Sequence, residues 1–256
     1  MTITTQPSEQ GHWYTKHGLP AYEIVGANGN KRATTLRDAR KLGLLPSVTT
    51  IIRGAAAPGL ELWKAKQVML AALTLSRNPG ETDDAYFARI MADSKEQARK
   101  AADRGTEIHA ALEQHFEMKA TDDPVMAQHI QGVVGQLDKH CGRQEWHAER
   151  SFAHSSGFGG KLDLHSDEWV IDFKTKEFGE DDELQTWDEH AMQLAAYDMG
   201  LTGTPRKGAI IYVSTTQPGL ARFLQIPDEE MTRGWGMFEA LLIFYKTKNN
   251  YYPEMA

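Results

Sequence analysis

A carboxylate and an ammonium group lie two positions apart within one apolar stretch of this sequence. Asp172 and Lys174 follow Val170 and Ile171, and they flank Phe173. On a β-strand, residues two apart point to the same face, so both charges would share one side of a buried strand. Burying charged groups is costly unless they are paired or bind a metal. The spacing therefore indicates either a structural ion pair or a site for charged chemistry.

A second carboxylate precedes this pair by nine residues. Asp163 ends a similar segment, and Ser166 with Asp167 can form a hairpin turn between the two segments. Such a hairpin would bring Asp163 beside Asp172, where two carboxylates and a lysine suit a divalent cation that activates water for attack on a phosphodiester. The alternative is that Asp163 caps a turn beside the preceding glycines. The glycine run 157–160 is not a phosphate-binding loop, because no helix start follows it.

The overall composition is that of an ordinary soluble globular protein. The chain has 256 residues, of which 41% are hydrophobic and 25% charged. A single cysteine, Cys141, excludes an internal disulfide, a cysteine-based zinc site and a four-cysteine iron–sulfur cluster. No run of about 18 apolar residues is present, and the N-terminus lacks the apolar core of a signal peptide. We therefore expect a cytoplasmic protein without a membrane span.

The net charge of −7 is unevenly distributed along the chain. Residues 1–119 hold 16 Lys and Arg against 13 Asp and Glu, whereas residues 120–256 hold 12 against 22. A bound cation would offset part of the acidic charge around Asp163 and Asp172. Basic residues of the first half, Lys100 and Arg104 among them, are candidate phosphate contacts. The alternative is that these charges form a solvated surface.

Turn signals and hydrophobic periodicity predict helices in the first half and alternating elements in the second. After a polar lead-in over residues 1–18, we expect a hairpin around Asn28-Gly29. Helices are predicted at 36–44, from a cap at Ser47 or Thr49, and at 60–75, 83–117, 124–141, 187–199 and from 227–230 onward. Strands are predicted at 146–154, 207–214 and 221–226, with two more that end at Asp163 and Lys174.

Five pieces of the sequence, in order, resemble the PD-(D/E)XK nuclease superfamily and its RecB-like exonuclease branch. Asp163 and the Asp172-Phe173-Lys174 tripeptide resemble the catalytic strands, and Gln193 with Tyr197 resembles the Gln-x-x-x-Tyr helix. Upstream, residues 105–109 are similar to a helix with a metal-binding histidine, His109. The segments 46–51 and 62–64 are similar to mitochondrial genome maintenance exonucleases and phage relatives.

This resemblance implies a restriction-endonuclease-like α/β fold, with a central mixed β-sheet flanked by helices and a helical N-terminal extension. It implies a division into residues 1–45 and a nuclease domain at 46–256, with a helical cover over about 46–141 and a catalytic core over about 142–256. The implied activity is a metal-dependent DNA exonuclease that acts on single-stranded ends in repair, recombination or phage DNA processing. We expect a monomer, with a recombination or replication protein as a further partner.

The resemblance also implies a role for each site residue. His109, Asp163, Asp172 and the backbone carbonyl of Phe173 would bind Mg²⁺ or Mn²⁺, Lys174 would act on the attacking water or the phosphate, and a glutamate at the position of Glu149 would join the site. The implied DNA contacts are Gln193, Tyr197, Thr175 and Ser47, together with the basic pair named above.

Each of these residues also has a structural explanation. His109 lies beside an apolar helical stripe, and it shares a face with Glu113 at i, i+4 spacing. Gln193 and Tyr197 have the same spacing and could pack the helix, and Glu149 could be an exposed strand residue. Two other functions stay open at this point: a double-strand endonuclease of the restriction type, and a catalytically silent nucleic-acid-binding module.

Overall fold

A five-stranded mixed sheet forms the centre of the protein in the computed structural model, which describes residues 12–27, 29–55, 58–201, 203 and 206–254. The strand order is β5-β6-β7-β8-β9, and all pairs are antiparallel except β7 with β8. The strands are β5 (His147–His154), β6 (Phe158–His165), β7 (Trp169–Lys176), β8 (Lys207–Ser214) and β9 (Ala221–Ile226).

The parallel pair of strands requires a crossover connection, which helix α6 (Asp188–Leu201) provides. Strands β8 and β9 have the predicted bounds, whereas β6 and β7 each extend two residues beyond the predicted ends at Asp163 and Lys174. The predicted ends were wrong because strand pairing continues past both residues: His165 of β6 pairs with His147 of β5, and Lys176 of β7 pairs with Ser214 of β8.

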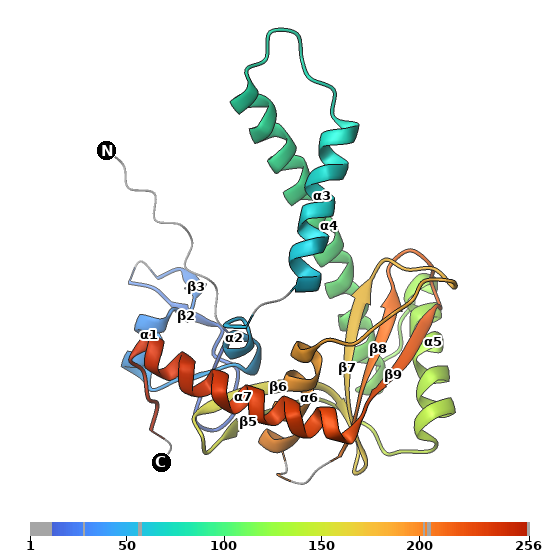
Figure 1. Cartoon of the computed structure of the whole chain (residues 1–256). Helices are drawn as coiled ribbons and strands as arrows, with labels where there is room; N and C mark the ends of the chain where they lie inside the picture. Colours follow the sequence, from blue (N-terminus) through green and yellow to red (C-terminus); the bar gives the residue numbers. More distant parts are fainter. Residues whose placement is uncertain (1–11, 28, 56–57, 202, 204–205, 255–256) are drawn as a thin grey trace.

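Helices cover both faces of the sheet and give a mixed α/β architecture (Figure 1). Helix α6 packs with α7 (Asp228–Asn249) and α2 (Val48–Ile52) on one face. Helices α4 (Asp83–Phe116) and α5 (Pro124–Cys141) pack on the other. The mixed sheet with flanking helices is therefore as the sequence predicts.

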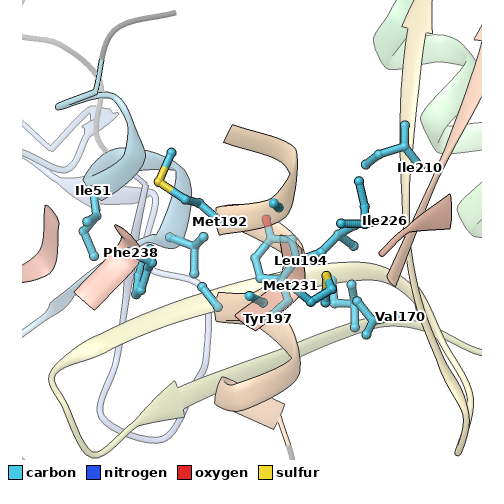
Figure 2. Packing of buried hydrophobic residues seen from close by; sticks show 14 of the residues in the cluster. Ile51, Val170, Met192, Leu194, Tyr197, Ile210, Ile226, Met231 and Phe238 are labelled. Carbon is cyan, nitrogen blue, oxygen red and sulfur yellow. The ribbon is translucent and has the colours of Figure 1, made fainter. Parts of the chain in front are cut away.

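One face of the sheet and helix α6 enclose the larger apolar core. Figure 2 shows Leu194 and Tyr197 of α6 among side chains from the strands and from α7, including Val170, Met231 and Phe238. These side chains are almost fully buried, and each buried aliphatic or aromatic side chain stabilises the fold by about 1.5–3 kcal/mol. This packing fixes the position of α6 relative to β7, the strand that carries the charged pair.

The segment after residue 11 is part of the folded protein, which corrects the prediction of a loose lead-in for residues 12–18; residues 1–11 lie outside the described structure. Strand β1 (Trp13–Tyr14) pairs with β4 (Leu45–Pro46), and Trp13 packs against Tyr251 near the C-terminus. The physical reason is that the aromatic side chains of Trp13 and Tyr14 are almost completely buried, with 2% exposure each. Their apolar surface outweighs the polar character of the surrounding residues.

The other elements before the sheet follow their local turn and cap signals. The hairpin of β2 (Glu23–Val25) and β3 (Lys31–Ala33) forms as predicted, and α1 (Leu36–Leu42) ends at Gly43, which has a left-handed backbone. Ser47 caps α2 by accepting a hydrogen bond from the Thr50 backbone N–H at 3.0 Å.

Helices α3 (Pro58–Thr74) and α4 form a long antiparallel pair that projects away from the sheet (Figure 1). Thr82 caps α4 and Asp123 caps α5, which confirms the predicted helix starts. The C-terminal part of α4 returns to the sheet and packs on β7. Among the described residues, no helix is both long and apolar enough to cross a membrane.

Candidate active site

Asp163 and Asp172 occupy opposing positions of β6 and β7 at the point where these two strands stop pairing. The ladder consists of His165 with Val170 and Leu164 with Ile171, so Asp163 and Asp172 are the next opposing pair. Opposing residues of antiparallel strands lie on the same face. Beyond this point the β5–β6 hairpin turns away from β7 (Figure 1).

The Asp163 side chain takes over a hydrogen bond that a continued ladder would have made. Its Oδ2 atom accepts a hydrogen bond from the backbone N–H of Phe173 at 2.8 Å. The acceptor holds the Asp163 carboxylate at the fork between the strands. This contact uses the N–H group of Phe173; the metal-ligand role that the resemblance implies for the Phe173 carbonyl stays a prediction.

Asp172, Lys174 and Gln193 form a closed hydrogen-bonded set. Lys174 Nζ lies 2.7 Å from Asp172 Oδ2 and donates to Gln193 Oε1 at 3.0 Å. Gln193 Nε2 donates to Asp172 Oδ1 at 2.7 Å and contacts the hydroxyl of Tyr197 at 3.1 Å. Gln193 thus uses one helix face to hold both members of the charged pair. Asp172 and Lys174 share one face of β7 because they are two residues apart, and Gln193 and Tyr197 share one face of α6 because they are four apart.

The surroundings raise the pKa values of both Asp163 and Lys174. Burial, and secondarily the neighbouring Asp172 carboxylate, raise the pKa of Asp163 to about 6. Burial lowers the pKa of Lys174, but attraction and hydrogen bonding to Asp172, with a further contribution from Asp163, more than offset this and leave it above its ordinary value. Lys174 is therefore a fixed positive charge at neutral pH.

Helix α4 brings His109 to the same place. His109 Nδ1 lies 3.8 Å from Asp163 Oδ2, and its ring meets the Phe173 ring edge-on at a centroid distance of 6.3 Å. The close approach of the helix depends on Gly105, because a Cβ atom there would lie 2.5 Å from the Thr175 hydroxyl oxygen on β7. Thr175 therefore lies against α4, one helical turn from His109.

Glu149 extends the acidic row onto a third strand. The β5–β6 register pairs Ala148 with Leu164 and Arg150 with Leu162, so Glu149 is opposite Asp163. Its backbone has φ of +56°, a conformation that non-glycine residues rarely adopt and that costs about 1–3 kcal/mol. The Glu149 carboxylate forms an ion pair with Lys161.

The donor set at this site fits a hard divalent cation. Asp163 and Asp172 repel one another in a partly desolvated place, and a cation would compensate that repulsion. Carboxylate oxygens with one imidazole nitrogen suit Mn²⁺ well and Mg²⁺ adequately. Within the described part of the chain, no three His, Cys, Asp or Glu side chains are already arranged as a ligand group. To bind a cation, Asp172 would have to give up its contact with either Gln193 or Lys174.

The predicted DNA contacts lie at different distances from this cluster. Tyr197 belongs to it, whereas the Ser47 hydroxyl is buried as the cap of α2, and residue 47 bridges to Gly159 on β6. Lys100 and Arg104 lie on α4 just before Gly105; Lys100 is exposed, and Arg104 pairs with Glu107 at 3.3 Å.

Sequence reasoning missed two residues of α6 that influence the charged pair. His190 is buried, and its Nδ1 accepts the Trp187 backbone N–H at 3.0 Å, which leaves the ring proton on Nε2 in the neutral form. Burial, and then Lys174, lower the pKa of His190 to about 4, and Glu189 contributes to the raised pKa of Lys174. The signal was present, since His190 precedes Gln193 by three residues on one helix face.

Comparisons with known proteins leave the family open. No known protein family and no curated protein matches the sequence. Among solved structures, a chain described as "Crystal structure of SSO0001" is 14% identical, with 71% of this chain and 86% of that chain covered and a TM-score of 0.27. A likeness of this size carries no argument about fold or function.

Proposed function

We propose that this protein is a metal-dependent DNA exonuclease that hydrolyses phosphodiester bonds from single-stranded ends, in repair, recombination or phage DNA processing. The observation that carries the proposal is the Asp172–Lys174 pair, which Gln193 holds beside Asp163 and His109. We assign the fold to the restriction-endonuclease-like class on the same grounds. Structural ion pairs seldom need a second carboxylate on the neighbouring strand and a histidine from a separate helix.

Asp163, Asp172 and His109 would hold Mg²⁺ or Mn²⁺, which supplies a bound water of lowered pKa and neutralises charge on the phosphate. The protein's own groups do the positioning. The carboxylate of Asp163 is anchored by the Phe173 N–H, so its orientation is set before substrate binds. Lys174 presents a positive charge where negative charge develops on the phosphate, and such a preorganised group stabilises the transition state without reorganisation.

Gln193 fixes the positions of Lys174 and Asp172 through a hydrogen bond to each. Its amide also donates a hydrogen bond to the Tyr197 hydroxyl, which fixes the Gln193 side chain in turn. Lys100 and Arg104 lie on α4, the helix that also carries His109. We assign them contacts with the phosphates of the DNA strand as it enters the site. Glu149 with its left-handed backbone lies in the same row as the two aspartates, and we assign it a supporting role there.

A double-strand endonuclease is the second candidate, because the same acidic pair and lysine would serve it. The Gln193–Tyr197 contact and the histidine on α4 favour the exonuclease, since these are the features that separate the two branches in the resemblance. A silent binding module is disfavoured because both Asp172 and Lys174 are present. The Asp172 side chain is only 3% exposed, and the Lys174 ammonium still pairs with it.

The test uses the full chain with end-labelled linear and closed circular DNA, each single-stranded and double-stranded, with Mg²⁺, Mn²⁺ or chelator. We expect linear single strands to be degraded, circles to survive, and chelator to stop the reaction. The matched controls are Asp172→Asn, which should be inactive, and Asp167→Asn in the nearby β6–β7 turn, which should be fully active. Rapid cutting of circular single strands would assign an endonuclease, and binding without cleavage under every condition would assign the silent module.

A further inference from the structure

Helix α3 is apolar on two opposite sides, and only one of these sides packs against the protein. Ala71 is 3% exposed, α3 packs against α4, and the Tyr86 hydroxyl of α4 donates a hydrogen bond at 2.9 Å to the carbonyl of Leu75, the residue that follows α3. Met69 lies about 200° around the helix from Ala71 at 100° per residue. Helix α4 therefore covers one side of α3 and leaves the other open.

The open side carries a row of large apolar residues, interrupted by Lys66, which we call the α3 stripe. Its members are exposed by between 37% and 81%, and they are Leu62, Trp63, Met69, Leu70 and Leu73. Figure 1 shows that α3 and α4 project away from the sheet, and among the described residues the large side chains on this side of α3 stay exposed. Exposed apolar patches of several hundred Å² on a soluble protein mark interaction sites.

The spacing of the stripe indicates a helix as its partner. Leu62, Lys66, Met69 and Leu73 are separated by four, three and four residues. This is the heptad spacing with which two helices pack along a common seam, and one polar residue such as Lys66 within such a seam commonly specifies the pairing. Nucleic acid has no such repeat to match.

We propose that α3 pairs with α3 of a second copy of this chain, antiparallel, through the α3 stripe. In the antiparallel register that places Leu62 opposite Leu73 of the second copy, Lys66 lies opposite Met69. The methylene stem of Lys66 can then cover the thioether while its ammonium reaches solvent. A parallel pairing would instead put the two Lys66 side chains face to face, which is unfavourable.

The area is also of the right order for self-association. The five residues of the stripe, each 37–81% exposed, expose on the order of 500 Å² per subunit, and with their flanking residues they approach the ~800 Å² per partner of a standard interface. We expected a monomer from the sequence, an expectation that took no account of which apolar residues lie outside the core. The proposal is independent of the nuclease activity and can be tested without substrate.

The experiment is sedimentation velocity and light scattering of the full chain, without DNA, from about 1 to 100 µM, the range that detects micromolar association. We expect the mass to rise from 28.7 kDa toward twice that value. A mass of 28.7 kDa at all concentrations would overturn the proposal. Association that occurs only when DNA is added would overturn it too, and would make α3 a DNA-binding surface.

Paired variants test the register. Leu73→Glu and Leu62→Lys should each weaken association by at least about tenfold, because each puts a charge in the seam. The double variant should restore association to within a few-fold of wild type, since the two new charges face each other only in the antiparallel register. No recovery would overturn that register. Leu60→Glu, on the same helix but off the stripe, is the matched control, and an equal loss there would overturn the assignment of the surface.

Discussion

The Asp163 carboxylate accepts a hydrogen bond from the backbone N–H of Phe173 at 2.8 Å, at the position where β6 and β7 separate. This bond directs a side chain into the fork between two strands, where a backbone carbonyl would otherwise lie. It also brings Asp163 toward Asp172, so the fold accepts electrostatic repulsion at this point. A cation bound at the proposed site would offset this repulsion and stabilise the folded state.

The first prediction concerns pH and stability in chelator. The folded protein holds the Asp163 proton up to about pH 6, whereas the unfolded chain releases it near 3.8. Between these values the folded state binds more protons, so rising pH reduces the free energy of unfolding. Relative to Asp163→Asn, which cannot titrate, wild type should lose on the order of 2 kcal/mol from pH 4 to pH 7, since one pKa unit corresponds to about 1.4 kcal/mol.

Urea unfolding of both proteins at a series of pH values measures this difference. Burial lowers the pKa of His165 and of His190 to about 4, so both residues reduce the free energy of unfolding on acidification. Both residues are present in both proteins, so their effects on the comparison largely cancel. Mn²⁺ or Mg²⁺ should restore stability to wild type at pH 7 more than to the variant. A pH profile that is parallel in the two proteins would show that Asp163 is not strained in the fold.

The second prediction separates chemistry from binding at Lys174. Lys174→Ala should reduce cleavage by on the order of 10²–10³-fold, because it removes a preorganised positive group beside the reacting phosphate. DNA affinity should change only a few-fold, since it depends on many phosphate contacts. Single-turnover cleavage and fluorescence anisotropy measure the two quantities.

Lys176→Ala is the matched control for that experiment. Lys176 lies on the same face of β7, two residues further along, and its ammonium lies over the Tyr212 ring at 5.7 Å. It should retain cleavage. Thermal melts must accompany both variants, because loss of Lys174 leaves Asp172 with Gln193 alone as its remaining contact among those described above. A well-folded Lys174→Ala protein with near-normal cleavage would make the lysine structural.

The sequence predicted which segments form strands and their order along the chain, and it brought Asp163, Asp172 and Lys174 to one place, because strand periodicity and a hairpin turn are local signals. The positions of His109 and Gln193 depend on how α4 and α6 pack on the sheet, and only the resemblance indicated them. Nothing local in the sequence indicates that Trp13 is buried against Tyr251, since these residues are far apart in the chain.

The third prediction concerns the amide that joins the charged pair. Gln193→Ala should lower the free energy of unfolding by about 1–3 kcal/mol, because it leaves the buried polar groups of Asp172 and Lys174 without their shared partner. Tyr197→Phe removes only the contact to Gln193 and should cost about 0.5–1.5 kcal/mol. Urea denaturation ranks the two. Equal losses would mean that Gln193 acts through Tyr197 and not through the charged pair.

The last prediction tests whether the approach of α4 to β7 positions His109. Gly105→Ala should destabilise the protein by about 1–3 kcal/mol, because the added methyl group would lie 2.5 Å from the Thr175 hydroxyl oxygen and must push the helix outward. His109 lies one turn further along α4, so the same shift should move it away from Asp163 and weaken Mn²⁺ binding, measured by calorimetry.

Thr175→Ala supplies the compensating change. It removes the hydroxyl group but keeps the Cβ atom, which would lie 3.6 Å from the new methyl group at position 105, an ordinary van der Waals distance. The double variant Gly105→Ala with Thr175→Ala should therefore recover most of the lost stability and metal affinity, as contacting residues do in a double-mutant cycle. If stability returns but Mn²⁺ affinity does not, the Thr175 hydroxyl itself takes part in the site. If neither returns, the helix is displaced by something other than this contact.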